Sequence, residues 1–195
     1  MYSDYGNYWV SSSKYLTVWG RHSTWFTMFL ACMITDITSI QEIKRSYNDS
    51  EKYDLFQAWK WFNFMFEFVF VLEICITIMF WSVLNKPDMY EGIALVDTLT
   101  RLDHCLPVVV LLFEFRLNSL QFCMRHFIGS LTICTIYMLV NMIVTFSDKP
   151  VYDVIDWQSY MGGVVVPLGM YVLLFLVYYV VKKIAFFKNV RCGLN

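Results

Sequence analysis

One stretch of the chain combines ionisable side chains with the length and apolar character of a membrane helix. The sequence TLTRLDHCLPVVVLLFEF, residues 98–115, carries Arg101, Asp103, His104 and Glu114. A charged side chain at the centre of a bilayer costs about 2.5–3.5 kcal/mol on insertion scales, so each of these groups needs a partner or a function. An imidazole near a carboxylate can take a proton from a hydroxyl, which is the chemistry of a general base.

Helical spacing sorts these side chains onto different faces of the segment. Asp97, Arg101 and His104 are spaced i, i+4 and i+7, which places them on one face of a helix. Asp103 and Glu114 point toward other neighbours, so more than one adjacent helix must supply polar partners. The predicted intramembrane polar network consists of Glu67, Glu73, Asp97, Arg101, Asp103, His104 and Glu114.

Two interpretations of these residues stay open. In the first, Glu73 or Asp103 tunes the imidazole of His104 for acid–base chemistry. In the second, the polar groups pair between helices and fix the register of those helices. Residue types alone favour the second. The histidines His22, His104 and His126 fall at different depths along their segments, so the sequence predicts no metal site and no cofactor.

The composition is that of an integral membrane protein. Hydrophobic residues make up 58% of the 195 residues and charged residues only 16%, which is too little polar surface for a soluble domain of this length. Aromatic residues reach 19%, and such side chains suit both lipid contact and the membrane interface. A net charge of −1 gives no basic face for nucleic acid. Residues 1–195 are therefore interpreted as a single multi-pass membrane domain.

Five apolar segments are long enough to cross a bilayer, which takes about 20 residues of helix. They cover about 15–40, 59–84, 93–115, 127–146 and 161–181. A strongly polar loop is expected at 41–54, and a mixed acidic and aromatic loop at 147–160. The predicted fold class is an all-α integral membrane protein, a compact bundle of about five transmembrane helices.

The distribution of Lys and Arg predicts the orientation of the bundle. With five spans, one side holds four basic residues and the other side, with the C-terminus, holds ten. The C-terminus is therefore expected in the cytoplasm, or in the matrix of a mitochondrion, and the N-terminus outside. The compartment stays open between the endoplasmic reticulum, the plasma membrane and the mitochondrial inner membrane. The glycosylation sequon at Asn48 lies on the cytoplasmic side and is expected to be unmodified.

Short motifs spread along most of the chain carry a further signal. They are YGNYWVSSSKYLTVWG at 5–20, Thr35-Asp36 at the end of the first helix, FW at 80–81, His-x-Leu-Pro at 104–107, Glu114, and PVYDVIDW at 150–157. The first five resemble segments of the androgen-induced, androgen-dependent transmembrane protein family. The last resembles the late loop of the related Rolling stone proteins.

This resemblance implies a reaction. Some members of the family hydrolyse fatty-acid esters of hydroxy fatty acids with an intramembrane threonine nucleophile and a histidine. The corresponding residues here are Thr17, in the Lys-aromatic-Leu-Thr motif, and His104, which would deprotonate Thr17 for attack on the ester carbonyl. In the family, the central histidine belongs to a motif resembling Asn-His-x-x-His, whereas Asp103-His104 stands alone. The span assignment sets Thr17 near the membrane surface and His104 roughly 16 Å into its helix.

Two functions follow from these observations. The first is a non-catalytic accessory or scaffold subunit packed in a larger membrane assembly, such as a mitochondrial inner-membrane complex. The small soluble fraction and the incomplete catalytic motif favour it. The second is an intramembrane hydrolase of fatty-acid esters that uses Thr17 and His104. In both, the expected partners are membrane lipids and, for the first, other membrane-protein subunits.

Overall fold

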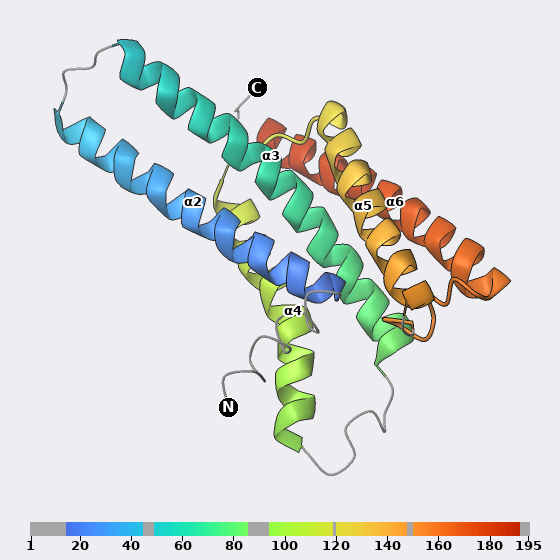
Figure 1. Cartoon of the computed structure of the whole chain (residues 1–195). Helices are drawn as coiled ribbons and strands as arrows, with labels where there is room; N and C mark the ends of the chain where they lie inside the picture. Colours follow the sequence, from blue (N-terminus) through green and yellow to red (C-terminus); the bar gives the residue numbers. More distant parts are fainter. Residues whose placement is uncertain (1–14, 45–48, 86–93, 119, 148–149, 192–195) are drawn as a thin grey trace.

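In the part of the chain that the structure describes, five long helices make up the fold (Figure 1). This computed structural model describes residues 15–44, 49–85, 94–118, 120–147 and 150–191, without the side chains of 36–56, 94–97 and 191. The helices are α2 (Leu16–Lys44), α3 (Asp49–Met79), α4 (Ala94–Leu117), α5 (Met124–Ser147) and α6 (Val166–Arg191). A π-helical turn, η1 (Phe80–Leu84), continues α3, and another, η2 (Met161–Val165), leads into α6.

The predicted all-α fold is confirmed, but α2, α3 and α6 extend beyond the predicted spans, α6 as far as Arg191. Helix α2 ends at Lys44 and α3 begins at Asp49, so most of the predicted loop at 41–54 is helical. Apolar length indicates how much of a helix suits the bilayer, but a helix can continue into polar sequence. Gln, Glu and Lys in this segment have high helix propensity, which explains the longer helices.

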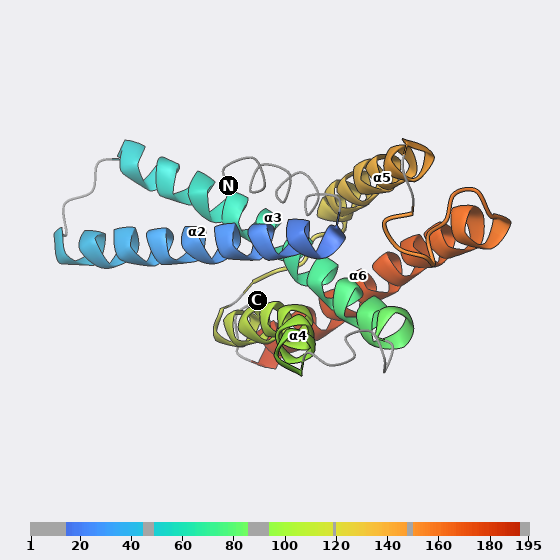
Figure 2. The same ribbon diagram turned by 60° about the horizontal axis from the view of Figure 1, so that its bottom comes forward.

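Helix α3 lies at the centre of the bundle. It packs against each of the other four helices, with α2 on one side and α5 and α6 on the other (Figures 1 and 2). In the most apolar part of 57–84, 61% of the residues are buried, against 28% in 124–147 and 22% in 161–190. Helices α5 and α6 therefore turn most of their apolar side chains outward.

Among the described residues, three helices are long and apolar enough to cross a membrane. They are 57–84, 124–147 and 161–190. The sequence predicts spans in α2 and α4 as well, but composition alone does not support them. Arg101, Asp103 and Glu114 interrupt the apolar sequence of α4, and Arg21 lies in the second turn of α2.

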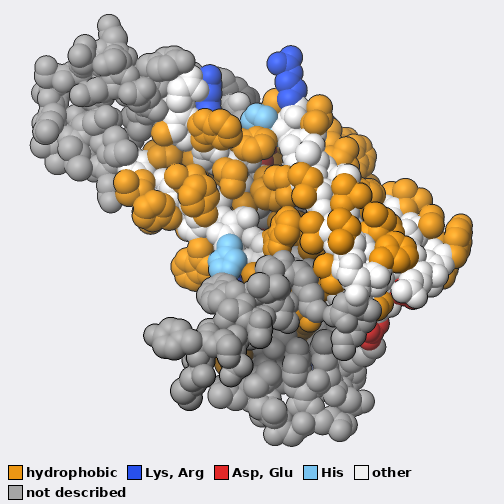
Figure 3. Space-filling view, viewed as in Figure 1, with side chains coloured by type: hydrophobic (Ala, Val, Ile, Leu, Met, Phe, Trp, Pro, Cys, Tyr) orange, Lys and Arg blue, Asp and Glu red, His pale blue; other side chains and the backbone are white. Residues whose placement is uncertain are grey.

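Hydrophobic side chains cover most of the described surface on the face seen in Figure 3. Exposed members on α5 and α6 include Ile128, Ile136, Ile143, Leu168, Val172, Phe175 and Leu176. A soluble monomer rarely exposes so extended an apolar surface, whereas a bilayer or a partner subunit would cover it.

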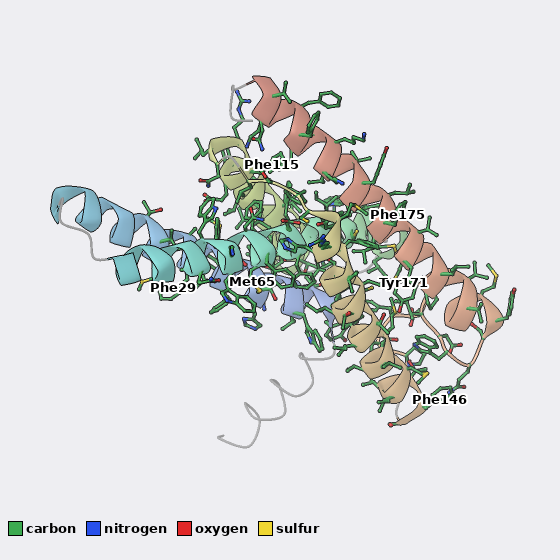
Figure 4. All side chains as sticks on the ribbon, turned by 90° about the horizontal axis from the view of Figure 1, so that it is seen from above. Phe29, Met65, Phe115, Phe146, Tyr171 and Phe175 are labelled. Carbon is green, nitrogen blue, oxygen red and sulfur yellow. The ribbon has the colours of Figure 1, made fainter. Side chains whose placement is uncertain are left out.

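Side chains from the helices converge at the centre of the bundle (Figure 4), and many of the buried ones are aromatic. Phe66 and Phe70 of α3 are almost completely buried. Phe70 stacks on Phe115 of α4, with the ring centroids 5.2 Å apart. Each such pair adds about 0.5–1.5 kcal/mol beyond the burial of its area. This packing holds α4 against the central helix.

Candidate functional site

A cavity opens where all five helices meet the loop between α5 and η2. The space between its walls is about 640 Å³, including the open part. Apolar side chains make up most of the wall. The lining residues are Leu16, Thr17, Leu72, Cys75, Ile76, Met79, Leu84, His104, Cys134, Tyr137, Tyr152, Val154, Ile155, Met170, Leu173 and Leu174. An apolar cavity with a few convergent polar groups is the usual form of a small-molecule site.

The first turn of α2 carries Thr17 to this cavity. The first N–H groups of a helix have no partner within it, and the N–H of Leu16 donates to the Tyr152 hydroxyl at 3.1 Å. Hydrogen bonds also join the Tyr152 hydroxyl to the side chains of Thr17 and Tyr137. Burial raises the pKa of Tyr152, so this phenol stays protonated and can donate a hydrogen bond.

His104 reaches the same cavity from the middle of α4. Its ring stacks on Phe80, the first residue of η1, with the centroids 3.8 Å apart and the planes 17° apart. Thr77 of α3 donates to the backbone carbonyl of His104 at 2.6 Å. The imidazole is buried, and its Nδ1 has no hydrogen-bond partner among the described residues. A buried nitrogen without a partner is costly, and it marks a place where a ligand or a water can bind.

An ion pair joins these two helices. Nη1 of Arg21 lies 3.0 Å from Oδ2 of Asp103, so the second turn of α2 lies beside the middle of α4. Thr17 is one turn before Arg21, and His104 directly follows Asp103. The expected separation in depth of roughly 16 Å assumed that α2 starts level with the start of α4. Both residues instead line one cavity, although no hydrogen bond joins them in the described structure.

Glu67 belongs to a separate polar cluster on the other side of α3. It is fully buried and accepts hydrogen bonds from Asn63 at 2.7 Å, from the backbone N–H of Cys123 at 3.1 Å and from Tyr178 at 2.5 Å. Nδ1 of His126 lies 2.9 Å from its carboxylate. These contacts join α3, α5, α6 and the segment before α5, which suits a structural role.

Within the described residues, the other members of the predicted network do not form one connected cluster with Glu67 or His104. Glu73 is buried and accepts a hydrogen bond from Thr24 of α2 at 3.0 Å. Glu114 accepts one from an amide a turn later in the chain, at 2.5 Å. Arg101 is half-buried on α4, and the side chain of Asp97 lies outside the described residues. Among the members of the predicted network whose side chains the structure describes, only His104 lines the cavity.

Two further residues of the cavity wall, Tyr137 and Tyr152, were not predicted from the sequence. Tyr152 lies in the PVYDVIDW segment, whose mixed polarity indicated only a loop near the interface. Tyr137 is one of several aromatic residues in an apolar helix, and nothing in its spacing separates it from lipid-facing neighbours. The PVYDVIDW resemblance was the available signal for Tyr152. Tyr137 had none.

The fold and the cavity define a class: an all-α protein with helices able to cross a membrane and a mostly apolar cavity at their junction. Within the described ranges, no group of three His, Cys, Asp or Glu side chains could hold a metal ion. A scan against protein-family models and searches of curated proteins and of solved structures find no match to this chain.

Proposed function

We propose that this chain is a multi-pass membrane protein that hydrolyses lipid esters in its central cavity. Thr17 is the nucleophile and His104 the general base. The observation that supports this proposal is that both side chains lie on the wall of one mostly apolar cavity. Apolar walls suit an acyl chain, and a small set of polar groups suits the ester that the chain carries.

The reaction needs only these two residues and water. His104 accepts the hydroxyl proton of Thr17 while the threonine oxygen attacks the carbonyl carbon of the ester. The tetrahedral intermediate expels the alcohol, which takes the proton from His104, and the acyl group stays on Thr17. A water that His104 deprotonates then attacks the acyl-threonine, and the fatty acid is released as the threonine oxygen takes that proton back from His104. Catalytic hydrogen bonds often form only once the substrate is bound, so a hydrolase of this kind need not show a hydrogen bond between Thr17 and His104 before then.

Two further arguments support this assignment. Thr17 and His104 are the positions that the resemblance to the androgen-induced transmembrane family implies. In the proposed topology α2 and α4 also cross the membrane, and the ion pair matches the opposite charges of Arg21 and Asp103. The C-terminus then faces the cytoplasm or the matrix, as the basic residues predict.

Covalent labelling tests the proposal. A fluorophosphonate probe should label the wild-type protein in membranes, and Thr17→Ala should abolish the labelling. His104→Ala should slow it strongly, because the threonine loses its base. Thr132→Ala is a matched control, since its exposed hydroxyl only bonds a carbonyl of its own helix, at 2.9 Å. Labelling that persists in Thr17→Ala would refute the proposal.

The exposed apolar faces of α5 and α6 favour a second candidate, a non-catalytic accessory or scaffold subunit. Only 28% and 22% of the residues in their apolar spans are buried, so other subunits could cover them. This candidate predicts that the protein, extracted in mild detergent, migrates with other membrane subunits. It also predicts that Thr17→Ala and His104→Ala leave all labelling and hydrolysis unchanged.

A further inference from the structure

The Tyr152 hydroxyl is the meeting point of three groups at the start of α2. Its oxygen accepts the Leu16 N–H at 3.1 Å, and hydrogen bonds join it to Thr17 and Tyr137. Tyr15 packs edge-on against its ring, with the centroids 5.8 Å apart. The loop residue thus holds the first turn of α2 by both its ring and its hydroxyl.

The hydrogens in this group can be counted. A phenol donates one hydrogen bond and accepts at most two. The N–H of Leu16 can only donate, so it takes one acceptor position. Tyr152 therefore accepts from one of the hydroxyls of Thr17 and Tyr137 and donates to the other. If Thr17 is to give its own proton to a base, Tyr152 has to donate to Thr17 and accept from Tyr137.

We infer that Tyr152 is a positioning residue for Thr17, an inference that rests on the proposed function. Its hydroxyl donates to the threonine oxygen and fixes that oxygen on the cavity wall. The hydrogen of Thr17 is then free to point toward His104. Tyr152 also takes up the N–H of Leu16, so one loop side chain sets both the position and the proton orientation of the nucleophile.

The variant Tyr152→Phe tests this, because it keeps the ring and removes only the hydroxyl. Misplacing a reacting atom by about 1 Å can slow a reaction by roughly 100-fold, so we expect kcat for ester hydrolysis to fall about 10- to 100-fold. KM should change less than about twofold, since the apolar wall that binds the acyl chain is intact. Tyr171→Phe is the matched control, because its hydroxyl bonds Thr135 between α5 and α6, at 3.2 Å.

A second measurement does not depend on catalysis. Loss of the Tyr152 hydroxyl should speed amide hydrogen exchange at Leu16 about 3- to 10-fold, the equivalent of one ordinary hydrogen bond. Should Tyr152→Phe not fold, fluorotyrosine at position 152 keeps the packing and alters the strength of the donor. It should change kcat with KM unchanged.

The outcomes separate this inference from the proposed function. Unchanged kcat in Tyr152→Phe, or a decrease matched by Tyr171→Phe, overturns the inference while the hydrolase stands. If the wild-type protein hydrolyses no ester, the proposed function fails. Hydrogen exchange then tests whether Tyr152 positions the start of α2. Faster exchange at Leu16 in Tyr152→Phe then supports a positioning role at the start of α2, and unchanged exchange overturns it.

Discussion

Arg21 and Asp103 form an ion pair, with Nη1 3.0 Å from Oδ2, that joins the second turn of α2 to the middle of α4. Each partner lies close in sequence to a residue of the proposed reaction, Thr17 before Arg21 and His104 after Asp103. We expect the pair to hold the two helices in the register in which Thr17 and His104 line one cavity. Its effect on activity should exceed its effect on stability.

Exchange of the two charges tests this relationship. Both side chains are partly exposed, 39% and 54%, so the pair contributes at most about 1 kcal/mol to stability. Arg21→Asp and Asp103→Arg alone should each slow ester hydrolysis by about 10-fold, because the helices lose their register. The double variant should recover most of the rate. Hydrolysis as slow in the double variant as in the single ones would show that the pair does not set the register.

Gly20 allows α2 to approach α3 closely. A Cβ at this position would lie 2.6 Å from Oε1 of Glu73 and 2.8 Å from Cδ1 of Ile76. The carboxylate cannot move away freely, because it is buried and bonded to Thr24 at 3.0 Å. Gly20→Ala should therefore lower stability by about 1–3 kcal/mol, measured by thermal unfolding in detergent micelles.

Gly169 supplies the control for that substitution. It lies in α6, and a Cβ there would meet no atom within 4 Å. Gly169→Ala should raise stability by about 0.5–1 kcal/mol, because alanine loses less backbone entropy in a helix. Equal destabilisation by both substitutions would mean that the close contact at Gly20 does not determine the packing of α2.

Substitution of Glu67 should lower the stability of the protein more than substitution of any other buried carboxylate. Glu67→Ala would leave the hydroxyl of Tyr178 and the N–H of Cys123 without their carboxylate acceptor. Breaking a buried charged contact costs about 3–5 kcal/mol, so the variant should unfold at a much lower denaturant concentration. Glu114→Ala should cost only about 1 kcal/mol, because its half-buried carboxylate has one local partner. Similar losses in both variants would contradict the role of Glu67 as the hub of its cluster.

The helices were predictable because their signal is local. Apolar length indicated all five, and composition supports three of them as membrane spans. The prediction of a loop at 41–54 was wrong for most of its length. Hydropathy indicates which residues suit the bilayer, but a helix can continue beyond the bilayer into polar sequence.

The site was predictable only in part. Thr17 and His104 came from a resemblance in short motifs, but their place on one cavity follows from contacts between helices, among them the ion pair between Arg21 and Asp103. Such a pairing joins residues distant in the chain, and the spacing within either helix does not encode it. Tyr152 reaches the start of α2 because its loop folds back onto that helix. The hydrophobic periodicity of the sequence does not predict such a contact.

The proposed orientation predicts which sites can receive a glycan. A sequon appended to the C-terminus and the natural sequon at Asn48 should both stay unmodified in microsomes, because they face the cytoplasm in that topology. A sequon appended before Met1 should be modified, since the N-terminus lies on the opposite side. A glycan at Asn48 would reverse the orientation and, with it, the side from which a substrate reaches the cavity.

The hydroxyl of Thr77 holds the backbone of α4 at His104. It donates to the His104 carbonyl at 2.6 Å, just before Pro107 removes a hydrogen bond from the same part of the helix. Thr77→Val keeps the shape and removes the donor, so it should lower stability by about 1–2 kcal/mol and slow ester hydrolysis. Thr132→Val, with an exposed hydroxyl, should change stability by less than about 0.5 kcal/mol and leave hydrolysis unchanged. If Thr77→Val loses stability but retains the full rate, the bond from Thr77 supports α4 without positioning the imidazole.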